Sequence, residues 1–539
     1  MPTLFKKKKE MWGPTVPDLM LGLSLAANLI YTAWKVRTQV HMLQQNSYRN
    51  ERYLNWMRKN PGRAFPPKDL LPFAALLPLF WSSLNLAVLI WLLIYVYLLV
   101  TVDKTPEKKK LVYTFRVKRL LALLAVVFLV WLLFLVSYAG PAVFFAALVL
   151  TNAAAPFWVL LGNTLIRPVE IAVQDWYYRD ARRKLAGMKG LKVIGLTGSY
   201  GKTSTKHILA KILAAKYNVL MTPESYNTTM GVVRTIREML KATHEVFVVE
   251  MGAMQRGDIK ELCDLVAPQY GVLTAIGEQH LETFKTLANI AQTKFELVEA
   301  IPEGGIAFLN IDDPNICAMP HTGNRKYIYY GLDAKEAHYR ATDISFDARG
   351  TTFTVRTPGG AERQFQTKLL GKHNVSNILA GIAVAAELGI ELGAIAAAVR
   401  DLNPVEHRLS LKRYPNNVTV IDDAFNSNPV GSRNALEVLG AFPGKRKILV
   451  TPGMIELGSR YYEANRAFGE YAAAVCDYII LVGEKQTAPI RDGLQGRNFP
   501  SDRMYVAKGL GEAVQRLQQI LQEGDVVLFE NDLPDIFNE

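Results

Sequence analysis

Hydrophobic positions are distributed differently in the two parts of this chain. Before residue 166 they form long runs: residues 70–102 and 120–166 carry no charge, and residues 17–34 carry only Asp18. A helix that crosses a bilayer needs about 20 predominantly apolar residues. The runs therefore predict about four membrane-spanning helices, with Gly140-Pro141 separating the last two.

The basic residues between the first two predicted spans disagree with this count. If the downstream region is cytoplasmic, four spans place residues 35–69 outside the cell, although this segment carries eight Lys and Arg residues. Loops so rich in positive charge normally stay on the cytoplasmic side. Three interpretations remain open: the first segment lies along the membrane surface, residues 70–102 are partly re-entrant, or the loop is an exception.

After Lys192 the pattern changes to short β-branched runs that alternate with amphipathic stretches. This alternation is typical of a parallel sheet with helices on both faces. Residues 338–370 instead indicate shorter antiparallel strands, followed by a helix over 375–388. The expected parallel strands are 193–197, 246–250, 271–276 and 306–310, and the expected helices are 202–216, 231–242, 257–265 and 286–299.

A break at Leu402-Asn403-Pro404 separates this domain from a second α/β unit, with strands expected at 418–422, 446–451, 477–482 and 525–529. The predicted fold class is an α-helical transmembrane region followed by two α/β domains. The first α/β domain has a mostly parallel sheet and the second is Rossmann-like. The expected boundaries are 1–166 for the transmembrane region, 167–190 for a basic juxtamembrane linker, 191–403 for the central domain and 404–539 for the C-terminal domain.

Charge and cysteine usage add partners and a compartment. The 539 residues include 62 Lys and Arg against 49 Asp and Glu, a formal net charge of +13. The basic residues cluster beside the apolar runs, at 6–9, 108–110 and 182–184, which favours a membrane flank over a nucleic-acid surface. Three distant cysteines fit neither a disulfide framework nor a metal site. We therefore expect a lipid bilayer as partner, no nucleic acid, and cytoplasmic catalytic domains.

The segment most informative about chemistry runs from Gly195 to Ser204. It follows an apolar strand and opens a helix, which is the context of a phosphate-binding P-loop, here with the spacing G-x-x-G-x-x-G-K-T. Glycines let backbone N–H groups surround phosphate oxygens, Lys202 would reach the β- and γ-phosphates, and the Thr203 hydroxyl would face Mg²⁺. The expected nucleotide-binding residues are Gly198, Ser199, Gly201, Lys202, Thr203 and Ser204.

A carboxylate ends the next apolar strand of this domain. Glu250 closes the run 246–250 and would suit a second contact to Mg²⁺ across the sheet. His280 comes after the following strand, and Lys294 lies on the following helix. Taken alone, such a histidine is more typical of a surface or core position, and such a lysine of a solvated helix face. These residues predict a nucleotide and metal site without specifying a reaction.

These residues and several later segments resemble the Mur ligase family, the ATP-dependent amide-bond ligases of peptidoglycan precursor synthesis. The resemblance runs in order from about residue 190 to 530 and is closest to the branch that joins D-alanyl-D-alanine to a UDP-linked muramoyl tripeptide. Besides the phosphate loop, the segments that carry it are 222–231 (TPESYNTTMG), 248–253 (VVEMGA), 280–282 (HLE), 292–296 (QTKFE), 371–377 (GKHNVSN), 406–409 (EHRL), 422–429 (DDAFNSNP) and 453–458 (GMIELG).

The resemblance implies a role for each matched residue. Lys202, Glu250, His280 and Lys294 would be catalytic, with Glu250 on a first Mg²⁺ and His280 on a second; the metal set would also include Thr203. Lys294 matches a lysine that CO₂ carbamylates, and the carbamate would supply negative charge beside the metal. Further matches imply nucleotide contacts from the central domain (Asn374, Asn377) and the C-terminal domain (Arg408, Asp423, Asn426, Asn428), and substrate contacts (Asn227, Thr228).

The implied reaction is ATP-dependent amide-bond formation. A substrate carboxylate attacks the γ-phosphate to give an acyl phosphate and ADP, and an amine then displaces phosphate. The cofactors would be ATP, Mg²⁺ and the carbamate on Lys294. The partners would be a carboxylate-bearing peptide acceptor and an amine donor, and the two α/β domains would close about residues 402–409. We expect a multi-pass ligase of the bacterial cytoplasmic membrane that acts on peptidoglycan precursors.

Five departures from the family pattern shape this expectation further. The apolar region replaces the family's usual N-terminal domain, which grips the UDP-linked sugar, so a membrane-bound or lipid-linked acceptor is our hypothesis. Tyr200 stands where a small polar residue is common. Asn227-Thr228 replaces a paired-Asn segment, Asn465 replaces a frequent His, and Glu530 begins a tail that lacks the family's basic Gly-Ser ending. The last three argue against D-alanyl-D-alanine as the amine donor.

One alternative belongs to a different class. A degenerate ligase module could bind nucleotide and regulate or couple a membrane process. Such a module could retain Lys202, but it would have no need for Glu250, His280 and Lys294 together at family spacing, so their presence favours an enzyme. A folylpolyglutamate synthase-like or cyanophycin synthetase-like enzyme fits less well, because residues 422–429 resemble the cell-wall branch.

Overall fold

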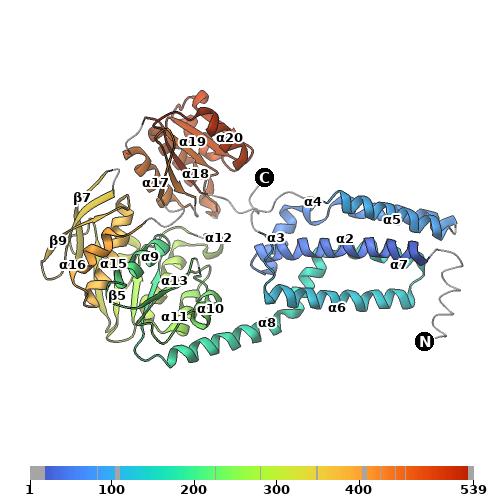
Figure 1. Ribbon diagram of the computed structural model, residues 1–539, viewed down its shortest axis with the longest axis horizontal. Coiled ribbons are helices and arrows are strands. Elements are labelled where there is room, and N and C mark those ends of the chain that lie inside the picture. Colours follow the sequence, from blue (N-terminus) through green and yellow to red (C-terminus); the bar gives the residue numbers. More distant parts are fainter. Residues whose placement is uncertain are drawn as a thin grey trace. The chain divides into compact units, whose positions relative to one another are not determined.

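The chain folds into two compact units, seen in the computed structural model of Figure 1. One unit holds the helical region up to Asp175, and the other begins at Trp176. The structure describes residues 18–81, 83–102, 110–224, 226–279, 281–347, 350–403, 409–424, 427–442, 445–455 and 457–531.

The first unit is entirely helical in the residues described. The break expected at Gly140-Pro141 is present, because α6 ends at Tyr138 and α7 begins at Pro141. A further break follows α7, where the chain bends by 72° into α8. The elements are α2 (Asp18–Gln45), α3 (Asn50–Lys59), α4 (Pro61–Ala64), η1 (Pro67–Trp81), α5 (Leu84–Val100), α6 (Phe115–Tyr138), α7 (Pro141–Ala153) and α8 (Ala155–Ala186).

Two helices in the described chain are long and apolar enough to cross a membrane, Leu19–Gln45 and Phe115–Tyr138, and the bent pair α7–α8 would make a third. The expected span over 70–102 is not one helix: η1 contains Pro72 and Pro78, and α5 is a separate apolar helix of 17 residues. Proline removes a backbone donor and interrupts helical hydrogen bonding, which explains the division. The count of four spans stays a prediction.

Polar side chains hold the helices of this unit together. Asp69 of η1 accepts a hydrogen bond of 2.6 Å from the Tyr31 hydroxyl and forms an ion pair with Lys35 of α2. On the neighbouring turns, the Thr32 hydroxyl donates to Asn152 of α7 at 2.6 Å. These bonds fix one face of α2 against η1 and α7.

The central domain is built on a nine-stranded sheet in the order β2-β3-β1-β4-β5-β6-β7-β8-β9. Strands β2 to β7 pair in parallel, while β7, β8 and β9 are antiparallel, as the sequence predicts for residues 338–370. The strands are β1 (Lys192–Thr197), β2 (Val219–Met221), β3 (Val246–Glu250), β4 (Tyr270–Leu273), β5 (Ile306–Asn310), β6 (Lys326–Gly331), β7 (Tyr339–Asp347), β8 (Gly350–Arg356) and β9 (Glu362–Thr367).

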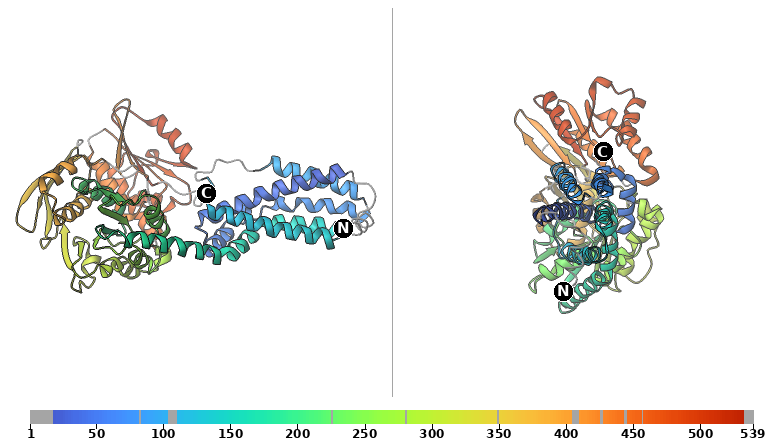
Figure 2. Two further views of the ribbon diagram at one scale, coloured as in Figure 1. Left: turned by 60° about the horizontal axis from the view of Figure 1, so that its bottom comes forward. Right: turned by 90° about the vertical axis from the view of Figure 1, so that its right-hand side faces the viewer.

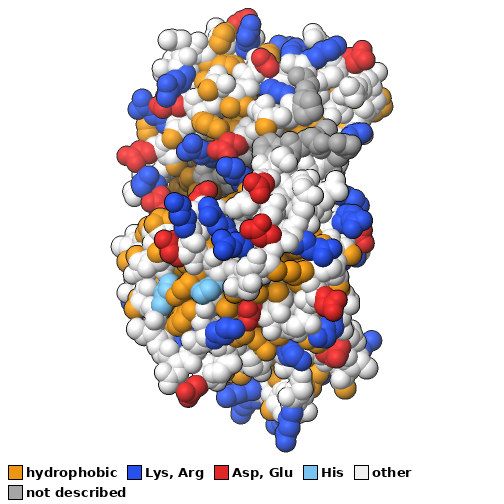
Figure 3. Space-filling model, turned by 90° about the vertical axis from the view of Figure 1, so that its left-hand side faces the viewer, with side chains coloured by type: hydrophobic (Ala, Val, Ile, Leu, Met, Phe, Trp, Pro, Cys, Tyr) orange, Lys and Arg blue, Asp and Glu red, His pale blue; other side chains and the backbone are white. Residues whose placement is uncertain are grey.

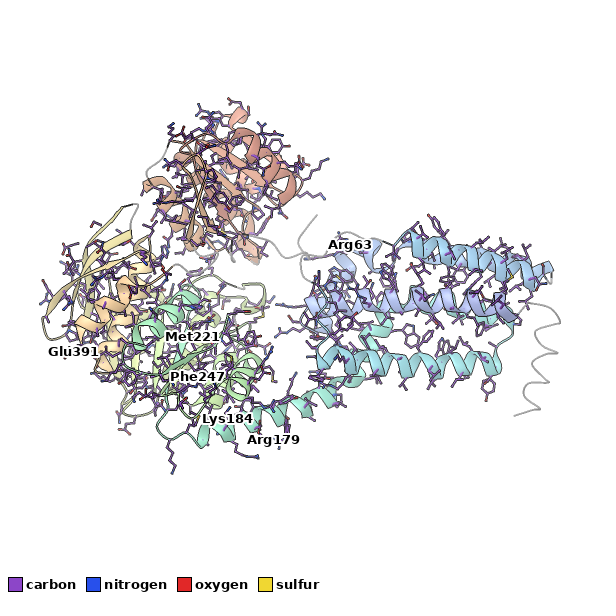
Figure 4. The ribbon with its side chains drawn as sticks, in the orientation of Figure 1. Arg63, Arg179, Lys184, Met221, Phe247 and Glu391 are labelled. Carbon is purple, nitrogen blue, oxygen red and sulfur yellow. The ribbon has the colours of Figure 1, made fainter. Side chains whose placement is uncertain are left out.

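Helices cover both faces of this sheet, as the alternating pattern predicts. Buried side chains of α9, α15 and α16 form one hydrophobic core with the sheet, and those of α10, α11 and α13 form the other, which includes the fully buried Phe247 (Figure 4). The helices are α9 (Lys202–Leu213), α10 (Thr229–Glu238), α11 (Asp258–Val266), α12 (Leu281–Phe284), α13 (Leu287–Ala300), α14 (Pro314–Cys317), α15 (Lys372–Glu387) and α16 (Leu392–Arg400).

The C-terminal domain has a six-stranded sheet in the order β10-β11-β15-β12-β13-β14. Only β10 is antiparallel to its neighbour, so the second α/β domain is also mostly parallel. Its elements are β10 (Ser410–Tyr414), β11 (Val418–Asp423), α17 (Pro429–Ala441), β12 (Lys447–Thr451), η2 (Gly458–Arg460), α18 (Tyr461–Val475), β13 (Tyr478–Val482), α19 (Ala488–Gly496), η3 (Ser501–Arg503), β14 (Met504–Ala507), α20 (Leu510–Ile520) and β15 (Val526–Glu530).

Helix α8 is continuous from the helical unit into the central domain (Figure 2). Its last turns pack against α10: Ala181 is fully buried, Asp180 pairs with Arg237 at 2.6 Å, and Lys184 donates to the Ile236 carbonyl at 2.8 Å. The residues expected to form a basic linker over 167–190 are therefore largely helical, up to Ala186, and their end belongs to the packed core of the central domain.

The surface of the second unit carries both signs of charge. On the face drawn in Figure 3, Lys and Arg side chains are interspersed with Asp and Glu, and hydrophobic side chains lie between them. The net positive charge of the chain is therefore not gathered into one basic stripe on this face.

Candidate functional site

The phosphate loop connects β1 to α9 and requires its glycines. Gly198 has a φ of +153° and Gly201 a φ of +78°, values that side chains with a Cβ rarely adopt. A Cβ on Gly198 would lie 2.1 Å from the Thr274 hydroxyl oxygen, and one on Gly201 would lie 2.6 Å from Asn377 Oδ1. The loop is thus a close-fitting backbone turn that leads directly to the N-terminus of a 12-residue helix.

This loop is bonded to the segment that follows β4. The Ser199 amide donates to the Ala275 carbonyl at 2.7 Å, and the Ser199 hydroxyl donates to the Gly277 carbonyl at 2.9 Å. The Tyr200 hydroxyl donates to the Glu278 carbonyl at 3.0 Å, and a Cβ on Gly277 would lie 2.4 Å from the Tyr200 ring. Tyr200, unusual for the loop, therefore fills space beside a glycine, and its burial raises the pKa of its phenol.

Lys202 begins α9 and bends back over the loop. Its ammonium donates to the Gly198 carbonyl at 2.6 Å and to the Ser199 carbonyl at 3.1 Å. A cation and the positive end of a helix are therefore held at the same turn. Both favour an anion such as a phosphate at this place.

Glu250 lies where β3 ends, beside the start of the phosphate loop. β1 and β3 are parallel neighbours with Leu196 opposite Glu250, so the carboxylate is at the carboxyl edge of the sheet. The Thr203 hydroxyl and the Asn227 side-chain amide both donate to Glu250 Oε1, each at 3.1 Å. The sequence prediction that Glu250 lies across the sheet from Thr203 is consistent with this geometry.

The surroundings of Glu250 keep it ionised. Burial alone would raise its pKa, but the charges of Lys206 and Lys202 and the hydrogen bond from Asn227 outweigh burial, and the pKa is lowered. Lys206 Nζ lies 3.0 Å from Oε2 as a buried ion pair. An anionic carboxylate beside a hydroxyl is a donor set that suits Mg²⁺, which takes oxygen ligands.

Lys294 is buried on α13, with 2% of its surface exposed, rather than on the solvated face typical of a helix lysine. Burial, followed by the charge of Lys202, lowers its pKa well below the ordinary value, although Asp258, Glu296 and Glu250 act in the opposite direction. The neutral form of the amine is therefore favoured more than in a solvated lysine. Lys294 interacts electrostatically with both Lys202 and Glu250, so it belongs to the same cluster.

Two asparagines of α15 were predicted to contact nucleotide. Asn377 joins the loop, because the Thr205 hydroxyl donates to its Oδ1 at 3.0 Å and the amide lies against Gly201. The Asn374 amide instead donates to the Leu370 carbonyl at 2.9 Å, at the start of the same helix. Asn377 is thus part of the loop's surroundings, while Asn374 supports the entry to α15.

The other predicted site residues fall into two groups. Thr228 and Asn428 each cap a helix, accepting a hydrogen bond from the amide of Gly231 at 3.3 Å and of Gly431 at 2.8 Å. Asp423 accepts one from the Leu409 amide at 3.2 Å within the C-terminal domain. Their roles toward nucleotide and substrate stay predictions. The residues that lie outside the described parts of the chain are His280, Arg408 and Asn426.

No group of three or more His, Cys, Asp or Glu side chains gathers as a metal site in the part of the chain that the structure describes. The predicted set of Glu250, His280 and Lys294 contains only one such residue among those described. Glu250 and Thr203 lie side by side, and their contacts to Mg²⁺ stay predictions. The second metal ion, assigned to His280, stays a prediction.

Sequence reasoning missed Lys206, the fully buried partner of Glu250. Its signal was its place four residues after Lys202, because residues at this spacing share one face of a helix. Sequence reasoning also left the buried carboxyl of Glu530 without a role. Glu530 accepts hydrogen bonds from Ser427 and, at 2.8 Å, from Thr451. Burial raises its pKa to about 7, against these hydrogen bonds and with a small contribution from the charge of Asp423.

A cleft of about 750 Å³ lies on α17 and α18 beside the phosphate-loop neighbourhood. Its wall includes Arg460, which pairs with Glu278 at 2.9 Å, and the backbone of Glu278 holds Tyr200 of the loop. Arginine and glutamate side chains occur in equal number on the wall: Arg433, Arg460, Arg497, Glu278, Glu463 and Glu470. Several of these charges pair with one another: Arg460 with Glu278 and Glu463, and Arg497 with Glu470.

Asn465, which replaces a frequent histidine, lies beneath this cleft and is fully buried. Its amide accepts from the Met454 amide at 2.9 Å and donates to the Met454 and Tyr461 carbonyls, each at 3.0 Å. The residue therefore fixes the turn at Gly453-Met454, which has a φ of +80° at the glycine. A direct substrate contact is not available to it in this arrangement.

Comparison with known proteins gives consistent matches for the second unit. The Mur ligase middle domain matches residues 196–385, and the Mur ligase, glutamate ligase domain matches residues 407–530. The UDP-N-acetylmuramoyl-tripeptide--D-alanyl-D-alanine ligase of Escherichia coli (strain K12) is 32% identical over 368 residues, covering 66% of this chain and 81% of that protein. The ligase of the same name from Bacillus subtilis (strain 168) is 31% identical, covering 63% and 73%.

Solved structures agree with the sequence comparison. The MurF ligase from Thermotoga maritima, in complex with ADP, is 27% identical with a TM-score of 0.60, covering 68% of this chain and 81% of that one. MurF from Acinetobacter baumannii is 25% identical with a TM-score of 0.59, covering 67% and 77%. The helical unit lies outside both matched domains.

Proposed function

Because the chain belongs to the Mur ligase family, we propose that it activates the carboxyl group of a cell-wall peptide with ATP and joins it to an amine. Its relatives are ATP-dependent ligases of peptidoglycan precursor synthesis, and the enzyme class follows from them. The observation that carries the proposal is the cluster at the phosphate loop, where Lys202, Thr203 and Glu250 meet.

Different residues have different roles in the first step. The loop glycines and Lys202 would hold the β- and γ-phosphates, and Lys202 would offset charge on the phosphoryl group as it is transferred. Thr203 and Glu250 would hold Mg²⁺, which supplies Lewis-acid polarisation of the phosphate oxygens. The acceptor carboxylate attacks the γ-phosphorus and ADP leaves, so the product of this step is an acyl phosphate.

The second step needs an amine at the acyl carbon. Its nitrogen attacks the carbonyl carbon, loses a proton, and phosphate leaves with the bonding electrons. The cleft on α17 and α18 supports placing the amine donor on the C-terminal domain, because its wall carries charges of both signs. For the Escherichia coli relative the printed name gives D-alanyl-D-alanine as donor. For this chain we propose a zwitterionic amino acid or short peptide.

Carbamylation of Lys294 is a separable part of the proposal. A neutral amine adds to the carbon of CO₂ and releases one proton, which leaves an anionic carbamate. The burial of Lys294 and the lowered pKa of its amine support this reaction, and the nearby charge of Lys202 would stabilise the product. The carbamate would add a negative group beside the metal that Glu250 holds.

We also propose that the helical unit anchors the enzyme in the cytoplasmic membrane, with the α/β domains in the cytoplasm where ATP is available. Support comes from α2 and α6, which are long and apolar enough to span a bilayer. Outward side chains of α6 are more than half exposed although they are apolar: Val126, Leu129, Val130, Leu133 and Phe134. Lipid would cover them, because exposed apolar surface of this extent is costly in water.

The proposal is tested by ADP release from the purified full-length protein in lipid nanodiscs. Cell-wall peptides, UDP-linked and lipid-linked, are combined with a panel of amino acids and dipeptides. ADP release that requires both an acceptor and an amine, with a new amide detected by mass spectrometry, is the expected result. Tight ATP binding without turnover under any combination would instead favour the nucleotide-binding module.

A further inference from the structure

A second cavity, of about 620 Å³, is an open groove of the helical unit between α2 and α6, and its wall includes the exposed side chains of Leu29 and Tyr113. One end is lined by Trp131 of α6 and Trp158 of α8, whose rings are 6.5 Å apart. Its volume is within the range of small-molecule sites, about 300 to 1,000 Å³. It belongs to neither matched Mur ligase domain.

The wall of this cavity suits hydrocarbon. Apart from Arg37 near one end, its lining is made of apolar and aromatic side chains with two threonines and a tyrosine. The hydroxyls of both threonines are already bonded: Thr32 donates to Asn152 at 2.6 Å, and Thr151 donates to the Ala147 carbonyl at 2.7 Å. In the middle of the cavity, a ligand would therefore make apolar contacts rather than hydrogen bonds.

The two ends of the cavity differ in polarity. Leu29 and Arg37 of α2 both line the cavity. Arg37 lies about two turns after Leu29, so the two residues are separated by about 12 Å along the helix axis. Arg37 lies toward the segment before α6, because Gln44 of the same helix bonds to the backbone of Val112 at 2.9 and 3.0 Å. Tyr113, the next residue, also lines the cavity. The cation and the phenol are thus at the end opposite the tryptophans.

This polar end is also the end from which the chain leaves for the catalytic domains. Arg119, near the start of α6, pairs with Glu170 of α8 through two bonds of 2.7 Å. Trp158, at the apolar end, is twelve residues earlier on α8, and the last turns of α8 pack in the central domain. An amphiphile in the cavity would therefore have its charged head at the end of the helical unit from which α8 continues along the chain.

We infer that this cavity holds the first part of the acceptor's lipid tail, the segment of a polyprenyl chain next to a phosphate that lies beside Arg37. The inference rests on the proposed ligase function and specifies its acceptor as lipid-linked. Three features support it: apolar walls between helices that can span a membrane, a single arginine at one end, and the direction of that end. A guanidinium group binds phosphate oxygens through paired N–H donors, so an arginine complements both the charge and the geometry of a phosphate.

The test uses a photoactivatable polyprenyl phosphate with the full-length protein in detergent micelles. Ala125, on the wall, and Ala122, outside the cavity, are both exposed residues of the same helix and make a matched pair. We expect saturable labelling of α2 and α6 that is lost in Ala125→Trp, retained in Ala122→Trp and reduced severalfold in Arg37→Gln. A tenfold excess of phosphatidylglycerol should leave the labelling unchanged.

Several outcomes would overturn the inference: equal labelling of both tryptophan variants, displacement by phosphatidylglycerol, or labelling only of outward-facing residues. Arg37→Gln gives an independent reading if Ala125→Trp fails to fold. Lys202→Ala should keep full labelling, since the cavity does not involve the phosphate loop. ADP release measured on the same wild-type samples separates the two proposals: turnover with UDP-linked acceptors and no labelling rejects the lipid site alone, whereas labelling without any turnover rejects the ligase proposal.

Discussion

Each unit of this protein contains one fully buried lysine–carboxylate pair, and the two pairs have different surroundings. Lys35 and Asp69 in the helical unit are 2% and 1% exposed, and Lys206 and Glu250 in the central domain are 0% and 1% exposed. Asp69 also accepts a hydrogen bond from Tyr31, which ties α2 to η1. Burial and charge alone therefore do not distinguish a structural pair from a catalytic one.

What distinguishes Glu250 is the set of backbone features that meet at it. It ends a parallel strand beside a glycine loop and a helix N-terminus, and the Thr203 hydroxyl in the first turn of that helix donates to it. We therefore expect substitutions in the central cluster to reduce catalysis with little loss of stability. Substitutions in the Lys35–Asp69 pair should instead reduce stability with little loss of catalysis.

The largest expected effect is on turnover. Lys202→Ala removes the cation from the transferring phosphoryl group and should lower ATP-dependent phosphate release by about 10³-fold or more. Lys211→Ala, an exposed lysine of the same helix, is the matched control and should retain activity. Unfolding midpoints of both variants should stay near that of the parent. Normal phosphate release by Lys202→Ala would remove the assignment of the phosphate loop.

The reverse behaviour is expected at Asp69. Asp69→Asn leaves Lys35 buried without its counter-charge and should reduce the free energy of unfolding by about 3 to 5 kcal/mol. Asp264→Asn breaks the exposed pair with Lys260 and should cost less than about 1 kcal/mol. Denaturant titration of the detergent-solubilised protein measures both. If Asp69→Asn abolished phosphate release while stability was unchanged, the helical pair would be catalytic and the comparison would fail.

The buried carboxyl of Glu530 should make stability depend on pH. Its pKa in the folded protein is raised to about 7 from an ordinary value of 4.5. Its contribution to stability is therefore complete below about pH 4.5 and lost as the pH rises through 7, because the unfolded state ionises first. The loss at pH 8 is on the order of 3 kcal/mol.

Two glutamine variants isolate this effect. Glu530→Gln should flatten the dependence of the unfolding midpoint between pH 5 and pH 8, whereas Glu523→Gln, at an exposed position, should leave it unchanged. Parallel curves for Glu530→Gln and the parent protein would show that the carboxyl does not titrate in this range.

The smallest effect concerns the carbamate. Lys294→Ala should lower ADP release by about 10²-fold, and millimolar acetate or propionate should restore part of it, because a carboxylate can occupy the place of the carbamate. Lys202→Ala should show no such rescue, which controls for non-specific effects of the acids. Absence of rescue would remove the carbamate while leaving the rest of the site intact.

Much of the α/β part could be predicted from local signals. The strand, glycine loop and helix around Gly198–Thr203 lie together in the chain, so their geometry follows from neighbouring residues, and Glu250 is identified by its place at the end of an apolar strand. The break at Gly140-Pro141 is likewise local, because a proline readily begins a helix but disrupts the hydrogen bonding of one that continues through it.

The parts that could not be predicted depend on distant contacts. The pairing of Lys206 with Glu250 and the burial of Lys294 need the sheet and its helices to assemble first. The position of the Tyr200 ring requires Gly277, which is far along the chain. The raised pKa of Glu530 requires its burial beside Ser427 and Thr451, which are also distant in the sequence. In the helical unit, the local effect of Pro72 and Pro78 was visible in the sequence, but the contacts of Asp69 with Tyr31 and Lys35 depend on packing.

The most direct test of the account follows the oxygen atoms of the acceptor carboxylate. An acceptor that supports ADP release is labelled with ¹⁸O in that carboxylate, and the inorganic phosphate released during turnover is analysed by mass spectrometry. Carboxyl activation at the cluster of Lys202, Thr203 and Glu250 predicts one ¹⁸O in each phosphate, because the bridging oxygen of the acyl phosphate leaves with it. Phosphate that contains only unlabelled oxygen would contradict the account.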